Sequence, residues 1–359
     1  MISTGTEIYA QARARFLSAA QEFGYDVSTH HLSGHTGPAQ EDLYCDVAIK
    51  RSGKLATTAL VTTSGVHGVE GFAGSTLQRA WMGEEQHRAF DLVHVHALNP
   101  YGFAWDRRAD QNNIDVCRNF VSFLGMEETN PGYQKYADII VPATGSRLRN
   151  ELRIIALQVS PGAAAMKDII TKGQYTHPHG MYYGGQESSW SRLVWEKIIT
   201  DMLASYQQVI HLDIHTGLGA YGDLQVIGTS GAQKEASLAR EAWGQRLAFM
   251  NHNGQNNSLS SPTSGDIEHA WTLVNGARPG AAATYTFEFG TRPPLQVFRA
   301  LQAEHAAYAR GEQAGSRDVR ALMRQAFAPA DEAWIGAVLR NGTKAYEGIA
   351  AILEKSPLL

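Results

Sequence analysis

Residues 56–100 contain two apolar stretches separated by a stretch of helical spacing, and this order restricts the chain to few folds. The stretches ATTALVTTSG (56–65) and FDLVHVHALNP (90–100) have the apolar, β-branched composition of buried strands. Between them, EGFAGSTLQRAWM (70–82) places its large apolar residues at helical spacing. A strand–turn–helix–strand order predicts parallel strands in an α/β sheet.

The rest of the chain extends this pattern. The Gly-, Asn- and Arg-rich segment 101–150 and the polar segment 251–266 are predicted to be loops. Neither an internal repeat nor a low-complexity linker is present. We therefore expect one α/β domain over 1–359, with a mixed, mostly parallel twisted sheet, helices on both faces and 313–359 as a helical C-terminal extension. Further strands are predicted at 43–51 (half-buried), 207–217, 223–229 and 282–290, and helices at 5–23 and 234–250.

Composition excludes several classes of partner. The 359 residues are 43% hydrophobic and 18% charged, which is typical of a globular protein. A net charge of −4 without a Lys/Arg-rich block argues against nucleic acid or an anionic membrane as partner. No stretch approaches the roughly 20 apolar residues that span a membrane, and the first residues do not resemble a signal peptide. Cys45 and Cys117 are the only cysteines, which excludes a disulfide framework and favours a cytoplasmic protein with reduced thiols.

Four polar residues follow the predicted strands. His67 and Glu70 come just after the strand at 56–65, His215 ends the strand at 207–217, and Glu288 lies near the end of the strand at 282–290. In open α/β sheets, ligands bind outside the carboxyl ends of the strands. Two His and one Glu are a common ligand set for catalytic zinc, and a further carboxylate can act as general base. This pattern predicts a hydrolytic metal site.

The ordered motifs resemble the zinc carboxypeptidase family. They are H-x-x-E at His67, NNIDVCRNF at 112–120, DIHTGLG at 213–219 and EFGT at 288–291. More narrowly, they resemble a little-characterised bacterial branch of that family, related to aspartoacylase and succinylglutamate desuccinylase. The set spans residues 58 to 292. The resemblance implies the phosphorylase/hydrolase-like sheet of that family, one zinc ion, and a peptide or N-acyl amino acid as substrate.

The resemblance also assigns roles to single residues. His67, Glu70 and His215 match the zinc ligands, and Glu288 matches the base that takes a proton from the attacking water. Asp115 matches the aspartate that orients the first histidine ligand.

Two arginine roles follow from the same comparison. Arg118 matches the arginine that binds a substrate carboxylate, where a planar guanidinium suits two oxygens. Either Arg107 or Arg108 matches the arginine that stabilises the oxyanion. In the family an Asn usually precedes the carboxylate-binding arginine, and here Cys117 takes that place in the substrate-binding motif. Because a thiol is a weaker hydrogen-bond donor than an amide, this difference favours a deacylase of N-acyl amino acids as the alternative function.

Other interpretations stay open at this stage. Arg118 either contacts substrate or pairs with Asp115, and the stretch 175–186 is either a pocket wall or a surface loop. Asp213 is expected to support the site rather than to bind the ion. A regulatory protein with a degenerate metal site is the alternative from another class. The oligomeric state is open, with a homo-oligomer through the C-terminal helices as one arrangement. A covering tyrosine, common in carboxypeptidases, is not identified among Tyr182, Tyr183, Tyr221 and Tyr285.

Overall fold

The structure of the protein is a computed structural model. It describes residues 7–53, 56–84, 88–124, 130–142, 147–157, 162–229, 233–250, 265–275, 282–312 and 316–355. No helix within these ranges combines the length and the apolar character that crossing a membrane requires.

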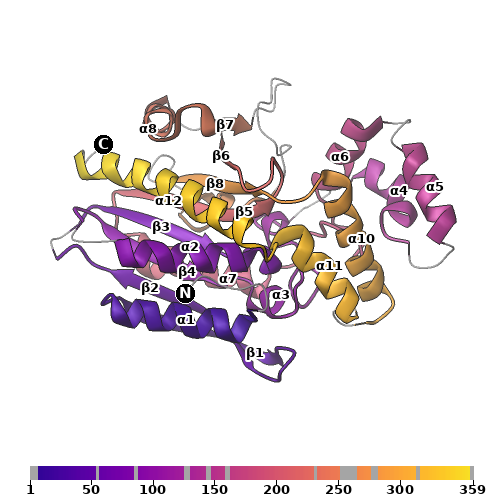
Figure 1. The fold of residues 1–359 in the computed structure, drawn as a ribbon, viewed down its shortest axis with the longest axis horizontal. Coiled ribbons are helices and arrows are strands. Elements are labelled where there is room, and N and C mark those ends of the chain that lie inside the picture. Colours follow the sequence, from indigo (N-terminus) through magenta and orange to yellow (C-terminus); the bar gives the residue numbers. More distant parts are fainter. Residues whose placement is uncertain are drawn as a thin grey trace.

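One mixed sheet of eight strands forms the centre of the domain, in the order β1-β2-β4-β3-β5-β8-β6-β7 (Figure 1). Its four central strands, β4, β3, β5 and β8, are parallel to one another, whereas β2 and β6 run antiparallel to their central neighbours. The predicted mixed, mostly parallel sheet is therefore confirmed. The strands are β1 Asp26–Thr36, β2 Asp42–Lys50, β3 Thr58–Ser64, β4 Asp91–His96, β5 Gln208–Gly217, β6 Leu224–Thr229, β7 Leu247–Met250 and β8 Ala282–Gly290.

Helices cover both faces of the sheet. The helices are α1 Tyr9–Glu22, α2 Gly71–Glu84, α3 Pro100–Ala104, α4 Pro131–Ile140, α5 Arg147–Leu157, α6 Ala163–Thr171, α7 Trp190–Ile198, α8 Gln233–Trp243, α9 His269–Asn275, α10 Pro294–Ala309, α11 Arg317–Phe327 and α12 Glu332–Lys355. Short 3₁₀ helices are η1 Gly68–Glu70, η2 Val116–Arg118 and η5 Gly244–Arg246, and η4 Ile199–Leu203 is a π-helix.

Each face of the sheet has its own apolar core. On one face, sheet residues such as Leu60 pack with α1, α2, α8 and α12, where Trp81 stacks on Tyr346 with ring centroids 4.4 Å apart. On the other face, residues such as Val61 pack against α7 and α9, with Trp195 fully buried. Because successive strand residues point to opposite faces, the central strands are apolar on both sides. The helices α4, α5, α6, α10 and α11 gather beyond one end of the sheet (Figure 1).

Three local predictions need correction. The segment 101–150 is not all loop, because Asn99 and Asn130 each cap a helix whose first residue is proline. The predicted helix at 234–250 ends at Trp243, and the chain turns at Gly244, with φ of 52°, before β7 begins. The strand at 43–51 is mostly buried rather than half-buried, since its side chains pack in the apolar clusters on both faces of the sheet. Of the predicted loop at 251–266, residues 251–264 lie outside the described residues.

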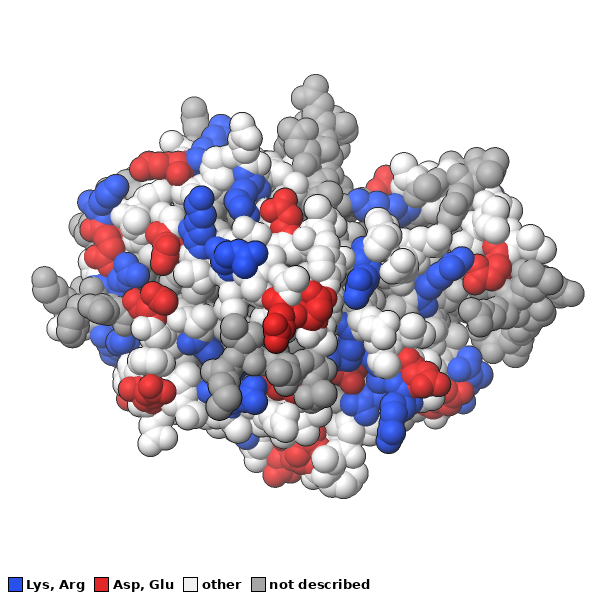
Figure 2. Space-filling view, viewed as in Figure 1, with Lys and Arg blue, Asp and Glu red and all other residues white. Residues whose placement is uncertain are grey.

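Acidic and basic side chains are interspersed over the face of the molecule in Figure 2. This distribution agrees with the low net charge of the sequence.

Candidate metal centre

His67 and Glu70 are positioned by a tight turn after β3. His67 precedes η1, and Glu70 ends it. A Cβ atom at Gly68 would lie 2.0 Å from the backbone carbon of Gly102 in α3, so only glycine allows this contact. The backbone N–H of Val69 also donates to the carbonyl of Arg107, at 2.8 Å. These contacts direct both side chains into one pocket.

His215 and Glu288 reach the same pocket from neighbouring strands. Their Cα atoms are paired across β5 and β8, which are parallel. The N–H of Thr216 donates to Glu70 Oε2 at 2.9 Å, and the N–H of Leu218 donates to Glu288 Oε1 at 2.8 Å. The strand end therefore orients both carboxylates.

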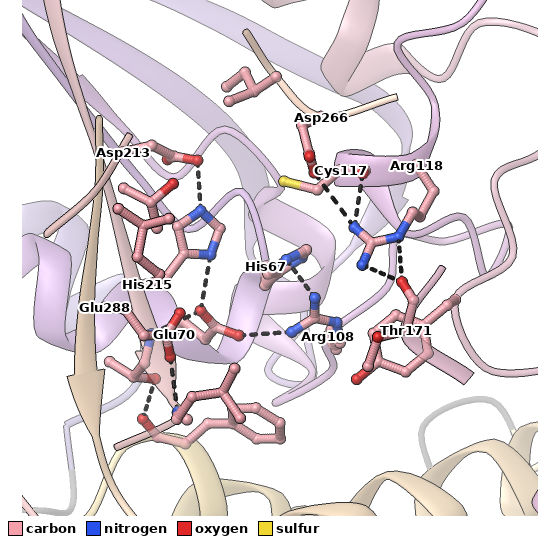
Figure 3. A pocket seen from close by; sticks show the side chains of 18 of the residues that line it. His67, Glu70, Arg108, Cys117, Arg118, Thr171, Asp213, His215, Asp266 and Glu288 are labelled. Carbon is pink, nitrogen blue, oxygen red and sulfur yellow. Dashed lines mark hydrogen bonds and ion pairs between the residues drawn. The ribbon is translucent and has the colours of Figure 1, made fainter. Parts of the chain in front are cut away.

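The three predicted ligands converge, as Figure 3 shows. His67, Glu70 and His215 are buried, and each offers a ligand atom within 4.8 Å of the others. The His215 Nδ1 atom lies 3.2 Å from Glu70 Oε2, and the two imidazole rings are 4.9 Å apart between centroids. His67 Nδ1 is buried without a hydrogen-bond partner. An unpaired imidazole nitrogen, a second imidazole and a carboxylate match the donor set that zinc prefers, so these residues fit a zinc ion.

Arg108 lies against this ligand set. It donates to Glu70 Oε1 at 3.0 Å and to Asp115 Oδ2 at 2.9 Å, and its Nη2 lies 2.5 Å from His67 Nε2. Burial and the Arg108 charge hold the pKa of His67 well below its usual value, so the ring is neutral, which is the form that binds a metal ion. Asp115 Oδ1 is 3.7 Å from His67 Nδ1, longer than a hydrogen bond. In this geometry Asp115 holds Arg108 directly and lies beside His67.

Arg107 does not take part in the site, which corrects its assignment as a candidate for the oxyanion. Its guanidinium is fully buried and pairs with Glu304, donates to Asn113 Oδ1 and to the Asp110 carbonyl, and stacks on the ring of Tyr308. Of these two adjacent arginines, Arg108 is the one that lines the pocket. Arg107 is a structural residue that joins α10 to the loop after α3.

Arg118 and Cys117 line the same pocket, and the Cys117 thiol contacts His215, with ligand atoms of Cys117, Asp213 and His215 within 4.8 Å of one another. Arg118 donates to the Thr171 carbonyl through Nε and Nη2, at 3.1 and 2.7 Å, and to the Cys117 carbonyl through Nη1. Three of its N–H groups are thus used within the protein. The predicted alternative, an Arg118–Asp115 pair, is not formed, because Asp115 pairs with Arg108. Burial raises the pKa of the Cys117 thiol to about 12, so it is neutral.

The buried charges of the site influence one another. Burial and the neighbouring Glu70 carboxylate raise the pKa of Glu288 to about 7. Burial opposes the charged form of His215, but Asp213, at 2.5 Å from its Nε2, raises the pKa of that ring well above its usual value. A carboxyl group with a pKa near neutrality is suited to proton transfer.

Several pocket residues were not identified from the sequence. Tyr182 lines the pocket, with its ring 5.0 Å from the Arg108 guanidinium and 5.3 Å from that of Arg118. Its φ of 53° is rare for a residue with a side chain, and such positions often lie at functional sites. Part of the stretch 175–186 is therefore a pocket wall. Thr171 of α6 and Phe327 of α11 also line the pocket, although no motif marked them.

Comparisons with known proteins place the chain in a family. The family model described as "protein of unknown function (DUF2817)" matches residues 6–341. The chain belongs to this family. A comparison with curated proteins finds no match.

Solved structures show the same fold. The crystal structure of thrombin-activatable fibrinolysis inhibitor is 12% identical, with a TM-score of 0.52 over 98% of this chain and 75% of that one. The bovine form, in complex with tick carboxypeptidase inhibitor, is 12% identical, with a TM-score of 0.50 over 97% of both chains. A metallopeptidase candidate from Shewanella amazonensis is 15% identical, with a TM-score of 0.44, over 85% of this chain and 93% of that one. The resemblance to carboxypeptidases is confirmed at the level of the fold.

Proposed function

We propose that the protein is a zinc-dependent hydrolase that cleaves a peptide or amide bond, in the manner of a carboxypeptidase, in a substrate that carries a carboxylate. The observation that carries this proposal is the convergence of His67, Glu70 and His215, with Glu288 paired to His215 on the next strand. These residues come from three separate parts of the chain. The stability of the fold does not explain why they meet in one buried pocket, because burying polar and charged groups together costs free energy.

Glu288 and Arg108 would assist the reaction, the first by moving a proton and the second by stabilising negative charge. Zinc held by the three ligands would supply Lewis acidity to a water molecule and to the substrate carbonyl. Glu288 takes a proton from the attacking water and returns it to the leaving amine. Arg108, fixed by Asp115, donates N–H groups to the carbonyl oxygen as negative charge develops.

A second candidate function is the deacylation of N-acyl amino acids at the same zinc site. The observation that favours it concerns Arg118, which donates three hydrogen bonds to backbone carbonyls and whose Nη1 also lies 3.5 Å from Asp266 Oδ1, so its charge is already paired within the protein. The Cys117 side chain beside it is a weak donor. Both features reduce the capacity of the pocket wall at Arg118 to bind the terminal carboxylate of a peptide.

The test is a substrate screen with the zinc-loaded protein. N-blocked dipeptides and a matched set of N-acetyl and N-succinyl amino acids would be compared by release of free amine. Preferential cleavage of the dipeptides supports the carboxypeptidase, and preferential cleavage of the N-acyl amino acids supports the deacylase. Zinc binding without turnover of either set would overturn the hydrolase and favour the metal-dependent regulatory protein.

A further inference from the structure

A chain of hydrogen bonds, partly buried at α9 and fully buried from His211 onward, runs from helix α9 across strands β8, β5 and β3 to the site. It begins at the indole of Trp271 and ends at the carboxylate of Asp213. Thr63, His211 and Asp213 have no exposed surface. The contacts are Trp271 Nε1 to Thr284 Oγ1 at 3.3 Å, Thr284 Oγ1 to His211 Nδ1 at 3.2 Å, His211 Nε2 to Thr63 Oγ1 at 2.9 Å and Thr63 Oγ1 to Asp213 Oδ1 at 2.5 Å.

The direction of these bonds follows from the chemistry of the two ends. An ionised carboxylate only accepts, so the Thr63 hydroxyl must donate its proton to Asp213. Thr63 Oγ1 can then only accept from His211, which requires the proton of that ring to lie on Nε2. His211 Nδ1 must therefore accept from the Thr284 hydroxyl, and Thr284 accepts from Trp271, whose indole only donates. Every group in the chain is satisfied by this one arrangement.

The same argument fixes the ring of His215. Thr63 occupies Asp213 Oδ1, and Asp213 Oδ2 lies 2.5 Å from His215 Nε2. Because Oδ2 also only accepts, Nε2 carries a proton. The other nitrogen, Nδ1, faces Glu70 Oε2 at 3.2 Å. It is therefore the nitrogen that points into the ligand set.

We propose that Asp213, Thr63 and His211 are positioning residues, joined in a hydrogen-bond relay that holds His215 with Nε2 protonated and Nδ1 directed at the metal. This inference rests on the zinc site of the proposed function. A partner on the far nitrogen of a ligating imidazole fixes its orientation and tautomer, and the loss of such a partner weakens metal binding. The relay extends this support to side chains that do not touch the ion.

The neighbouring residue Thr62 provides a matched control. Its Oγ1 lies 2.8 Å from His94 Nδ1, and both residues are fully buried. Thr62 and Thr63 are adjacent on β3 and point to opposite faces of the sheet. Replacing either threonine with valine removes a buried contact to a histidine and one further side-chain bond, to Asp213 for Thr63 and to Gln78 for Thr62, but only Thr63→Val interrupts the relay.

The first test reads the tautomer of His211 in the metal-free protein. Nitrogen-15 correlation spectra of the histidine side chains distinguish a proton on Nε2 from one on Nδ1. The relay predicts the Nε2–H form for His211 in the wild type and in Thr62→Val. An Nδ1–H form in the wild type would reverse the direction of the chain and overturn the inference.

The second test measures the dissociation constant of zinc by competition with a chromogenic chelator. Asp213→Asn is expected to weaken binding about 10- to 100-fold and Thr63→Val about tenfold, as for other partners of ligating residues. Thr63→Ser, which keeps the hydroxyl, and Thr62→Val should bind zinc like the wild type. Equal dissociation constants for Thr63→Val and Thr62→Val would refute the relay. A wild type that binds no zinc would instead refute the proposed function, and the His211 spectra would still decide the relay.

Discussion

His215 on β5 and Glu288 on β8 are directly paired across two parallel strands. The sheet register therefore places a proposed zinc ligand beside the proposed general base, without help from a loop. Burial and the Glu70 carboxylate raise the pKa of Glu288 to about 7, and the backbone N–H of Leu218 fixes one of its oxygens. Sites built on strands hold their geometry more rigidly than sites on loops.

Glu288→Gln should keep zinc and lose activity. The amide has nearly the shape of the carboxylate but cannot take a proton, so we expect kcat to fall at least about 10²-fold. The measurement is kcat on the substrate found in the screen, together with zinc content. Glu268→Gln, which changes another carboxyl group of the pocket lining, should leave kcat within a few-fold of the wild type. Equal losses in both variants would count against Glu288 as the base.

The two adjacent arginines should differ in what their removal changes. Arg108→Met is expected to lower kcat about 10²- to 10³-fold, as for other oxyanion donors. Arg107→Met should instead lower the free energy of unfolding by about 3–5 kcal/mol, because it leaves the buried Glu304 carboxylate without its arginine partner. Urea unfolding and steady-state kinetics of both variants separate these effects. The assignment is wrong if Arg107→Met is as stable as the wild type.

The Arg107–Glu304 pair also predicts how stability depends on pH. Burial acts to raise the pKa of Glu304, but Arg107 and His305 lower it to about 2. A carboxyl group whose pKa is lowered by folding stabilises the protein above its usual pKa of about 4.5, and this contribution is lost as the pH falls towards 2. The difference in unfolding free energy between wild type and Glu304→Gln should therefore shrink between pH 6 and pH 3. A difference independent of pH would contradict this account.

Gly68 is predicted to be indispensable for the turn that carries His67 and Glu70. A Cβ atom there would meet the backbone of Gly102 at 2.0 Å and that of Phe103 at 2.2 Å. Gly68→Ala should cost at least about 3 kcal/mol of unfolding free energy and weaken zinc binding, since backbone cannot move aside easily. Gly83→Ala in α2 is the control, because its Cβ would meet only the end of the Phe23 ring, at 3.3 Å. Thermal unfolding of both variants tests this difference.

The sequence predicts the central part of the fold, and the residues that meet in the pocket, for a physical reason. The strands β3, β4, β5 and β8 are buried on both faces, so their apolar runs are distinct, and polar residues at their ends are conspicuous. His67, Glu70, His215 and Glu288 could all be found in this way. Strand β1 was missed because most of its residues are exposed and it lacks such a run.

The remaining parts of the site depend on tertiary contacts. Arg107 and Arg108 are indistinguishable in sequence, and the contacts that separate them, such as that of Arg107 with Glu304 on α10, join distant parts of the chain. Tyr182 does not belong to a recognisable sequence motif. Its backbone has a positive φ, which the sequence does not reveal. The helices α3 and α4 each begin with an Asn-Pro pair, in which the Asn caps the helix, and this local signal is readable in the sequence.

The most direct test of the proposal is the zinc content of the purified protein, measured by mass spectrometry for wild type, His67→Ala, Glu70→Ala and the control His94→Ala. His94 is buried in the sheet and bonds to Thr62, outside the ligand set. We predict about one zinc per chain in the wild type and in folded His94→Ala, and loss of zinc in His67→Ala and Glu70→Ala. A wild type without zinc after purification in zinc-containing medium, or ligand variants that retain it, would contradict the account.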